Sequence, residues 1–220
     1  MVPPLKRRRA GTRPYGKLRF LIVSGPTREP IDPVRFISNY STGTMGKYLA
    51  EAAKHEKTAV TWVECPKDAG TARELLEKLK TLLPKHDVLI MAAAVCDVRP
   101  KTVSKSKIKK DRLSSITLVK NPDLLAALSK IKEKWQIFFG FGLESSDILK
   151  NGRNKLRKKS LELIVLQKVT IKHNPFGNKK IQATVLKKSG EIREFKSVSK
   201  RNLAHFLIRE AIGLSRKISG

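Results

Sequence analysis

The sequence predicts an α/β fold, a doubly wound and mostly parallel sheet of the Rossmann-like kind, on two observations. From Leu18 onward, apolar runs of strand length alternate with segments whose apolar residues recur at helical spacing. The runs are almost continuously apolar, which is typical of strands buried on both faces. Alternating strands and helices build a parallel sheet with helices on both sides. With 220 residues and 40% hydrophobic composition, the chain can bury a sizeable core.

The first half of the chain contributes three predicted strands and two predicted helices. Strands are expected at LRFLIVS (18–24), TAVTWVE (58–64) and DVLIMAAAV (87–95). The first of these ends at a Gly-Pro pair, which interrupts regular structure. Between the strands, MGKYLAEAAKH (45–55) and ARELLEKLKTLL (72–83) place their apolar residues on one helical face.

The alternation continues in the second half. NPDLLAALSKIK (121–132) is predicted as a helix, because an Asn-Pro pair opens it. QIFFGF (136–141) is predicted as a strand, SSDILKNGRNKLRKKS (145–160) as a basic helix and LELIVLQ (161–167) as a further strand.

Two segments interrupt this pattern. Residues 98–120 are rich in lysine, too polar for a core and too long for an ordinary connection, so we expect a lid or an arm there. Residues 180–196 are predicted to form a β-hairpin that turns at Ser189 and Gly190. A last amphipathic helix is expected around residues 202–214.

The net charge is extreme, +28, from 47 Lys and Arg against 19 Asp and Glu. Such a field attracts polyanions, whether nucleic acid, an acidic membrane or small phosphorylated substrates. Dense basic runs lie near the start of the chain and around residue 155. The first run also contains several prolines and matches a flexible tail. We therefore expect a basic tail at 1–17 and a single domain at 18–220.

Neither the cysteines nor the histidines form a metal-binding pattern. Cys65 and Cys96 lack CxxC spacing, and no two histidines lie four residues apart, so any metal is expected to arrive with a ligand. No signal peptide and no long apolar run is visible. The sequence therefore predicts a cytoplasmic protein without a membrane partner.

Polar and small residues follow several predicted strands. In an open parallel sheet, ligands bind beyond the carboxyl ends of the strands, so Asn39, Cys96, Asp97 and Phe141 should meet at one edge. Neither GxGxxG nor GxxxxGK[ST] occurs. Taken alone, PVRFISNYSTGTMG (33–46) is either a loop that caps a helix or a site where amides bind an anion.

Several motifs in order carry a resemblance to a known family. They are GPTREPIDPVRFISNYSTGTMG, AAAVCDVRP, KIKK, KNPDLLAAL and GFGLES, across roughly residues 18–215. The chain thus resembles phosphopantothenoylcysteine synthetase, a ligase of coenzyme A biosynthesis. The resemblance implies that 4'-phosphopantothenate is activated as an acyl nucleotidylate by CTP or ATP, and that cysteine then displaces the nucleotide. The decarboxylase domain that precedes the bacterial synthetase is absent from this chain, so we expect the synthetase alone.

The resemblance implies two catalytic residues. Asn39 matches the family's essential Asn, whose amide would hold the carbonyl oxygen of the intermediate as that oxygen gains charge. Lys107, with Lys109 and Lys110, matches a KxKK motif on a mobile lid, where cations neutralise a triphosphate and closure excludes water.

The resemblance also implies binding residues. Those implied to meet a phosphate, of the nucleotide or of the pantothenate substrate, are Arg35, Ser41, Thr42 and Gly43. Those implied to contact the nucleotide are Ala92, Ala93, Asp97, Lys107, Lys109, Pro122, Asp123, Leu124, Leu125, Phe141, Lys155 and Lys159. Triphosphate chemistry brings Mg²⁺, with Asp97 as the candidate ligand. A homodimer is implied, because family members build the pantothenate pocket across two subunits.

The chain departs from the family at several positions. The family's Asn-Asp pair after the 161–167 strand is Gln167 and Lys168 here, and an expected Asn is Ile181. The segment before the 72–83 helix is shortened, so the sheet is expected to lack one strand. These departures bear on how the base is recognised and on the rate of the reaction. The sequence does not decide whether the nucleotide is CTP or ATP.

Two alternatives remain beside the ligase. One is a catalytically silent nucleotide-binding paralogue, and the other is a basic nucleic-acid-binding protein on the same scaffold. Aromatic residues are only 6% of the chain, and no stacking platform for bases is visible. Binding to nucleic acid is therefore expected to be non-specific.

Overall fold

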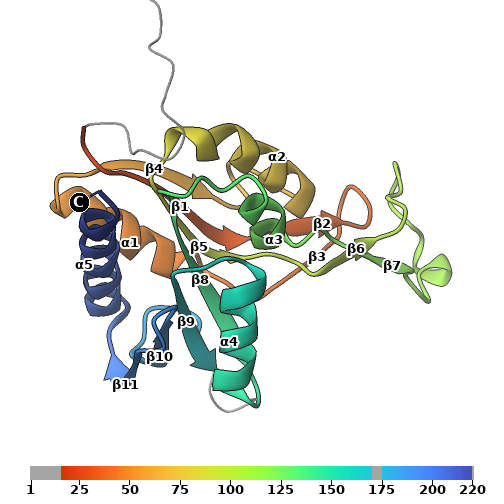
Figure 1. Cartoon of the computed structure of the whole chain (residues 1–220). Helices are drawn as coiled ribbons and strands as arrows, with labels where there is room; N and C mark the ends of the chain where they lie inside the picture. The colour runs from red at the N-terminus through yellow and green to blue at the C-terminus, as the bar shows by residue number, and fades with distance from the viewer. Residues whose placement is uncertain (1–15, 170–174, 220) are drawn as a thin grey trace, which may run out of the picture.

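The main sheet has seven strands in the order β11–β10–β9–β8–β5–β1–β4 (Figure 1). A computed structural model describes residues 16–169 and 175–219; the predicted tail lies largely outside them. Five strands are parallel neighbours: β1 (Arg19–Pro26), β4 (Ala59–Glu64), β5 (Val88–Ala94), β8 (Ile137–Glu144) and β9 (Leu163–Lys168). The predicted fold class is confirmed.

The predicted C-terminal hairpin is also present and joins the same sheet. β10 (Ile181–Lys187) pairs antiparallel with β9, and β11 (Ile192–Val198) pairs antiparallel with β10. At the other edge of the sheet, β4 leads through residues 65–71 into a helix without forming a further strand. This matches the shortened segment seen in the sequence.

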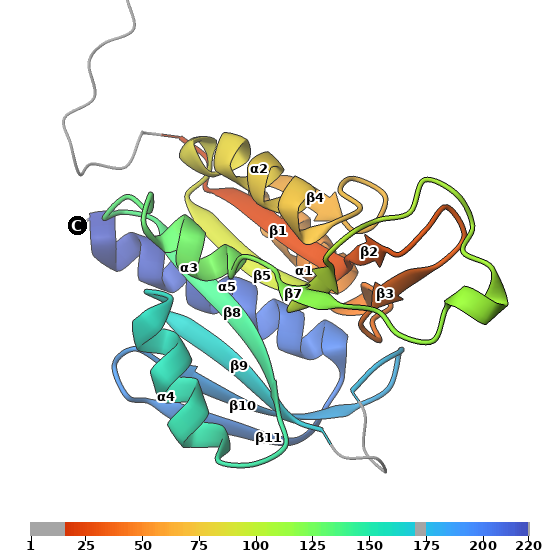
Figure 2. The same cartoon turned by 90° about the vertical axis from the view of Figure 1, so that its right-hand side faces the viewer.

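Helices cover both faces of the sheet (Figure 2). α1 (Thr44–His55) and α5 (Lys200–Ser219) pack on one face. α2 (Ala72–Leu82), α3 (Leu124–Ser129) and α4 (Ile148–Lys158) pack on the other. Along β1, Phe20 and Ile22 face the first layer while Leu21 and Val23 face the second. This two-residue period explains why the strands read as continuous apolar runs.

The prediction of a helix over 121–132 is wrong in its extent. α3 begins only at Leu124, because the Asp123 side chain accepts a hydrogen bond from the Ala126 amide and so caps the helix. The helix ends at Ser129. The residue before it, Leu128, is the last one of this segment that packs into the core. A short 3₁₀ turn, η1 (Leu83–Lys85), follows α2.

Two small ladders that the sequence does not predict project from one end of the sheet (Figures 1 and 2). β2 (Arg28–Pro30) pairs with β3 (Phe36–Ser38), and β6 (Val98–Pro100) pairs with β7 (Leu118–Lys120). The second ladder closes the base of the Lys-rich excursion, residues 98–120, which we call the arm. The arm also contains a 3₁₀ turn, η2 (Lys110–Arg112). β2 packs against β6, so both ladders form one projection.

Across residues 16–169 and 175–219, no helix combines the length and the apolar composition needed to span a membrane.

Candidate functional site

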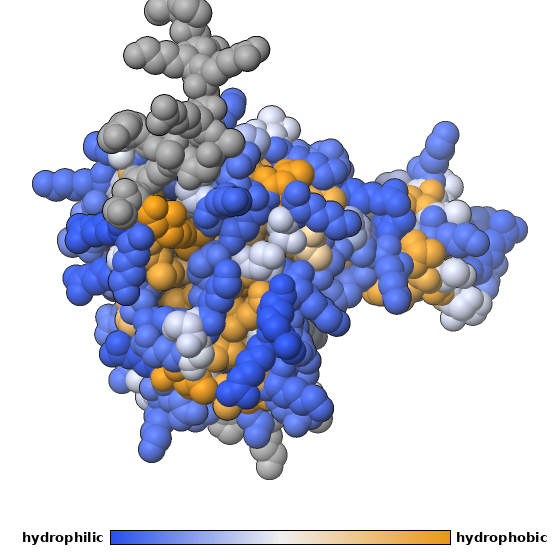
Figure 3. Space-filling view, viewed as in Figure 1, coloured by the Kyte–Doolittle hydropathy of each residue, from blue (hydrophilic) through white to orange (hydrophobic). Residues whose placement is uncertain are grey.

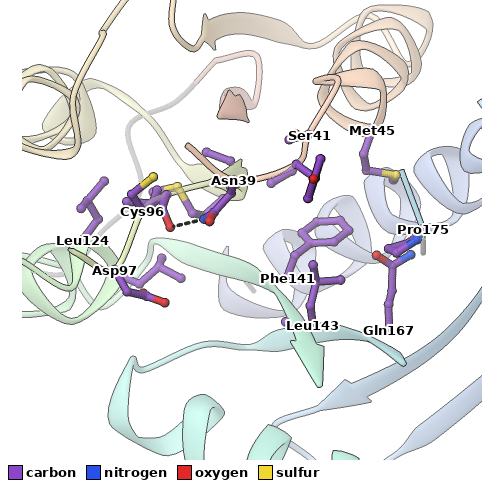
Figure 4. Close-up of a pocket in the computed structure, with 18 of the residues that line it drawn as sticks. Asn39, Ser41, Met45, Cys96, Asp97, Leu124, Phe141, Leu143, Gln167 and Pro175 are labelled. Carbon is purple, nitrogen blue, oxygen red and sulfur yellow. Dashed lines mark hydrogen bonds between the residues drawn. The ribbon is translucent and has the colours of Figure 1, made fainter. Parts of the chain in front are cut away.

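A cavity of about 620 Å³ lies where the carboxyl ends of the central strands meet the loops that follow them. It brings together most of the candidate residues: Asn39, Ser41, Thr42, Gly43, Ala92, Ala93, Asp97, Pro122, Asp123, Leu124, Leu125, Phe141, Lys155 and Lys159. Figure 4 shows Asn39, Ser41, Asp97 and Phe141 around it. Loops separated by up to 120 residues therefore converge at the edge where open parallel sheets bind ligands.

The loop after β1 delivers the first turn of α1 to this cavity. Gly43 is the N-cap of α1, with a left-handed φ of 67°, and no side chain caps the helix. Gly43, Thr44 and Met45 all line the cavity. The first amides of a helix have no partner within it, and the helix dipole favours an anion beside them. This turn can therefore bind a phosphate.

The side chain of Asn39 is held by the end of the neighbouring strand. Its Nδ2 donates a hydrogen bond to the carbonyl of Val95, at 2.9 Å (Figure 4). Among the described residues, the second N–H of this amide has no acceptor. Asn39 is exposed and lines the cavity, so that N–H is available to a bound molecule.

The turn after β5 is fixed by buried hydrogen bonds. The amide of Cys96 donates to Thr27 Oγ1 at 2.9 Å, and Asn121 Nδ2 donates to the carbonyl of Cys96 at 3.0 Å. Burial raises the pKa of the Cys96 thiol. It also raises the pKa of Cys65 to about 12. Both cysteines are therefore neutral thiols near neutral pH, which does not suit a nucleophile.

Among the described residues, three lysines line the cavity, and they differ in their partners. Lys155 Nζ lies 2.5 Å from Glu144, and Lys159 Nζ lies 3.0 Å from Asp123. The third, Lys200, was not a candidate from the sequence. Its Nζ donates to the carbonyl of Gly177 at 2.6 Å. A sequence signal existed, because a lysine at the first residue of a helix opposes the helix dipole.

Further residues that were not candidates from the sequence also line the cavity. Figure 4 shows Met45, Leu143 and Pro175 facing it. Gln167, the first of the departures from the family, is nearly buried and also lines it. Lys168 is not among the described lining residues, and Ile181 is buried in the core. Of Gln167, Lys168 and Ile181, Gln167 is therefore the one found among the described residues that line the candidate site.

The arm lysines and Arg35 are not among the described residues that line this cavity. Lys107 and Lys109 are exposed on the arm. The guanidinium of Arg35 contacts the carboxylate of Asp32 and donates to the carbonyl of Ile108 at 2.7 Å. The amide of Ile108 in turn donates to Asp32, at 3.1 Å. Arg35 and Asp32 thus fasten the arm beside the lysines.

Asp32 is an ionised acid in this arrangement. Its side chain is buried, and the hydrogen bond from the Arg35 side chain, followed by backbone amides, outweighs burial and holds the pKa of Asp32 well below its usual range. At neutral pH the carboxylate of Asp32 is therefore charged, and it keeps its hydrogen bonds with Arg35 and with the Ile108 amide of the arm.

No group of three or more His, Cys, Asp or Glu that could hold a metal occurs among the described residues. Asp97 and Asp123 bring carboxylates to the cavity, and Asp123 is paired with Lys159. One carboxylate beside a triphosphate fits Mg²⁺, which is usually bound by substrate phosphates, water and one or two carboxylates. Asp97 fits that role.

An open, mainly parallel α/β sheet with a cavity at its carboxyl edge defines a class of ligand-binding domains. Residues 16–214 match the family model described as DNA/pantothenate metabolism flavoprotein C-terminal domain. The chain belongs to this family, that of the phosphopantothenoylcysteine synthetase domain.

Relatives support this assignment. The coenzyme A biosynthesis bifunctional protein CoaBC of Vibrio vulnificus strain CMCP6 is 36% identical over 193 residues, 81% of this chain and 48% of that protein. A protein named cysteine/cysteine sulfinic acid decarboxylase, from an unknown prokaryotic organism, is 38% identical over 215 residues, 92% of this chain and 60% of that protein. The chain therefore spans about half the length of the curated relatives it matches.

A solved structure of the C-terminal domain of CoaBC superposes with a TM-score of 0.72 at 30% identity, covering 90% of this chain and 96% of that one.

Proposed function

We propose that this protein is a ligase that joins 4'-phosphopantothenate to cysteine, using CTP or ATP. The observation that carries the proposal is that one cavity is lined by Asn39, the first turn of α1, and residues that follow β5 and β8. Family membership gives these residues their roles. We also propose that residues 18–220 act as one synthetase domain.

In the first half-reaction, the pantothenate carboxylate attacks the α-phosphorus of the nucleotide, and pyrophosphate leaves. The amides at the start of α1 are placed to hold phosphate oxygens, and Phe141 supplies an apolar face for the base. Lys155 and Lys159 line the same cavity, and each would contact the nucleotide by exchanging its pairing with Glu144 or Asp123 for the phosphates. Mg²⁺, with Asp97 as ligand, would neutralise the triphosphate.

In the second half-reaction, the amine of cysteine forms a bond to the acyl carbon and loses a proton to solvent, and the bond from that carbon to the nucleotide oxygen breaks, so that nucleoside monophosphate leaves. Negative charge develops on the acyl oxygen. Asn39 is positioned to donate its remaining N–H to that oxygen, because its other N–H is fixed by Val95. A donor held in place before the reaction stabilises the transition state without reorganisation.

We further propose a homodimer formed through the projection at the end of the sheet. Five large apolar side chains are exposed there: Val34, Phe36, Val103, Ile116 and Leu118. Figure 3 shows apolar patches on this projection. Clustered exposed apolar residues mark an interface. A second copy would also explain why Lys107 and Lys109 lie outside the cavity of their own chain, since a shared pocket draws residues from both subunits.

A cytoplasmic location fits this activity. The two cysteines are free and buried, as expected in a reducing compartment.

The test is to mix the purified protein with phosphopantothenate, cysteine, Mg²⁺ and each nucleoside triphosphate in turn. We expect the amide product, nucleoside monophosphate and pyrophosphate with CTP or ATP. Omitting cysteine should stop the amide but allow pyrophosphate release. A folded protein that gives no product with any triphosphate would refute the ligase.

A further inference from the structure

Lys200, the first residue of α5, is a buried cation for which the described part of the chain provides no counter-charge. Only 7% of its surface is exposed, and within the described residues no carboxylate contacts it. The residues outside the described ranges include no Asp or Glu. The other two cavity lysines each pair with an acid. A buried charge is costly unless it is paired, so an unpaired one needs another source of stabilisation.

The bonding of Lys200 leaves room for a ligand. An ammonium carries three N–H donors, and one of them is donated to the carbonyl of Gly177. The other two have no acceptor among the described residues. Burial, and then the neighbouring charge of Lys179, lowers the pKa of Lys200. An anion beside the ammonium would offset both effects.

Contacts place Lys200 next to the first turns of α1. The guanidinium of the following residue, Arg201, lies 5.0 Å from the ring centre of Tyr48. Tyr48 is four residues, about one helical turn, beyond Thr44 on α1. Its hydroxyl donates to Asn178 Oδ1, close to the Gly177 carbonyl that Lys200 holds. Lys200 and Thr44 line the same cavity.

Two independent features thus favour negative charge at this corner of the cavity. One is the uncapped amino-terminal turn of α1, and the other is the buried ammonium of Lys200. We propose that Lys200 is an anion-binding residue that, together with this turn, binds a phosphate group of the nucleotide or of the acid substrate. The choice between these two phosphates rests on the proposed function, whereas the anion site does not.

The experiment measures binding to the full-length protein by calorimetry, with inorganic pyrophosphate, CTP, ATP and phosphopantothenate as separate probes. Lys200→Gln should weaken pyrophosphate binding on the order of 10-fold or more, because it removes a charge-assisted hydrogen bond. Lys200→Arg should retain most of the affinity. Among the other probes, the one that loses affinity identifies the phosphate that Lys200 contacts.

Lys54→Gln is the matched control, since Lys54 is an exposed lysine in the last turn of α1 that is not among the lining residues. It should leave pyrophosphate binding within about twofold of the parent, because an exposed charge is screened. If Lys200→Gln binds all four probes as the parent does, or if Lys54→Gln loses as much as Lys200→Gln, the inference is wrong.

Lys200→Met separates binding from a structural role. Removing an unpaired buried charge should leave the Tm of the ligand-free protein unchanged or raised. Pyrophosphate should then raise the Tm of the parent but not that of Lys200→Met. A large drop in ligand-free Tm with the pyrophosphate shift retained would show that Lys200 only braces Gly177.

The two proposals fail separately. If pyrophosphate binding depends on Lys200 but no amide forms, the ligase is refuted and the anion site stands. If the amide forms and Lys200→Gln changes neither binding nor turnover, the ligase stands and Lys200 has no role in it.

Discussion

The two glycines of STGTMG serve the fold in different ways. Gly43 adopts a positive φ of 67°, which turns the chain from the loop into α1. Gly46 lies against β1, where an added Cβ would come within 2.0 Å of the Ser24 Cβ. Gly46 thus lets the first turn of α1 approach the sheet, and so places that turn beside the cavity.

Gly46→Ala should therefore destabilise the protein, on the order of 1–3 kcal/mol or more, because the new methyl group overlaps a side chain that cannot move away. Denaturant unfolding measures the change. Gly213→Ala is the matched control, since Gly213 lies within α5 and an added Cβ there meets nothing within 4 Å. The control should be neutral or stabilising by up to about 1 kcal/mol, because Ala favours a helix. Equal stabilities for the two variants would contradict this packing argument.

A substitution of Asn39 tests the proposed hydrogen bond from its side-chain amide to the acyl oxygen. Asn39→Asp keeps the shape of the side chain but places negative charge where the acyl oxygen gains charge. The second half-reaction should slow on the order of 10²-fold or more, as after the loss of an oxyanion donor. The acyl nucleotidylate should still form and accumulate, which quenched-flow analysis detects.

The control for Asn39→Asp is Asn202→Asp, at an exposed position of α5 that is not among the lining residues. It should leave both half-reactions unchanged. Amide formation by Asn39→Asp at the parent rate would instead make Asn39 an ordinary loop residue.

Among the elements, the arm projects from the end of the sheet, and its β6 packs against β2. Besides its β6–β7 base, three hydrogen bonds tie it to the segment between β2 and β3: Ser104 to Ile31, Ile108 to Asp32, and Arg35 to Ile108. Two of these involve the Asp32–Arg35 pair. The position of Lys107 and Lys109 therefore depends on the charge of one buried acid.

Asp32→Asn should loosen the arm, because the amide replaces an acceptor with a donor that faces the Arg35 guanidinium. Trypsin at neutral pH should then cleave the arm several-fold faster than in the parent. Asp111→Asn is the matched control, since Asp111 is exposed on η2 of the same arm. Cleavage of Asp32→Asn at the parent rate would mean that other contacts hold the arm.

The Asp32–Arg35 pair also predicts the direction in which the free energy of unfolding changes with pH. The pKa of Asp32 is lowered in the folded state, so its contribution to the free energy of unfolding is complete above the unfolded pKa, about 3.9. That contribution is lost as the pH falls below this value. The stability difference between parent and Asp32→Asn should be constant from pH 5 to 7 and should shrink below about pH 4. A difference that grows in acid would contradict the assignment.

At the scale of the whole molecule, the charge of +28 is the reason for the alternative of a nucleic-acid-binding protein, which can be tested against the ligase. Residues 1–15 hold five Lys or Arg and no acid, and they lie outside the described residues. Deleting them should leave turnover nearly unchanged. Binding to duplex DNA should be weak, and it should fall steeply with salt, by a logarithmic slope of about 0.9 per neutralised phosphate.

Lys107→Gln should do the reverse. It should impair turnover, because the proposed lid loses a cation, while the salt dependence of DNA binding changes little. Tight binding of a defined sequence at physiological salt, together with normal turnover of Lys107→Gln, would make the basic surface the function instead.

The parallel sheet, the helix faces and the edge where the candidate residues meet are all predictable from the amino-acid sequence. These depend on local periodicity and on the rule that parallel strands present their carboxyl ends together. The departures at element ends arise because capping, as at Asp123, depends on single hydrogen bonds. Three-residue strands such as β2 and β6 are too short to show any period.

The pairings between distant residues become visible only in the folded chain. Arg35 and Asp32 meet Ile108 across more than seventy residues, and no local pattern encodes such a contact. Lys200 reaches the cavity because α5 packs beside α1, so its burial and its lack of a carboxylate partner among the described residues emerge only once both helices lie on the sheet. The periodicity of the sequence predicts which face of a helix is buried. Only the packing of the helices on the sheet determines which residues that face contacts.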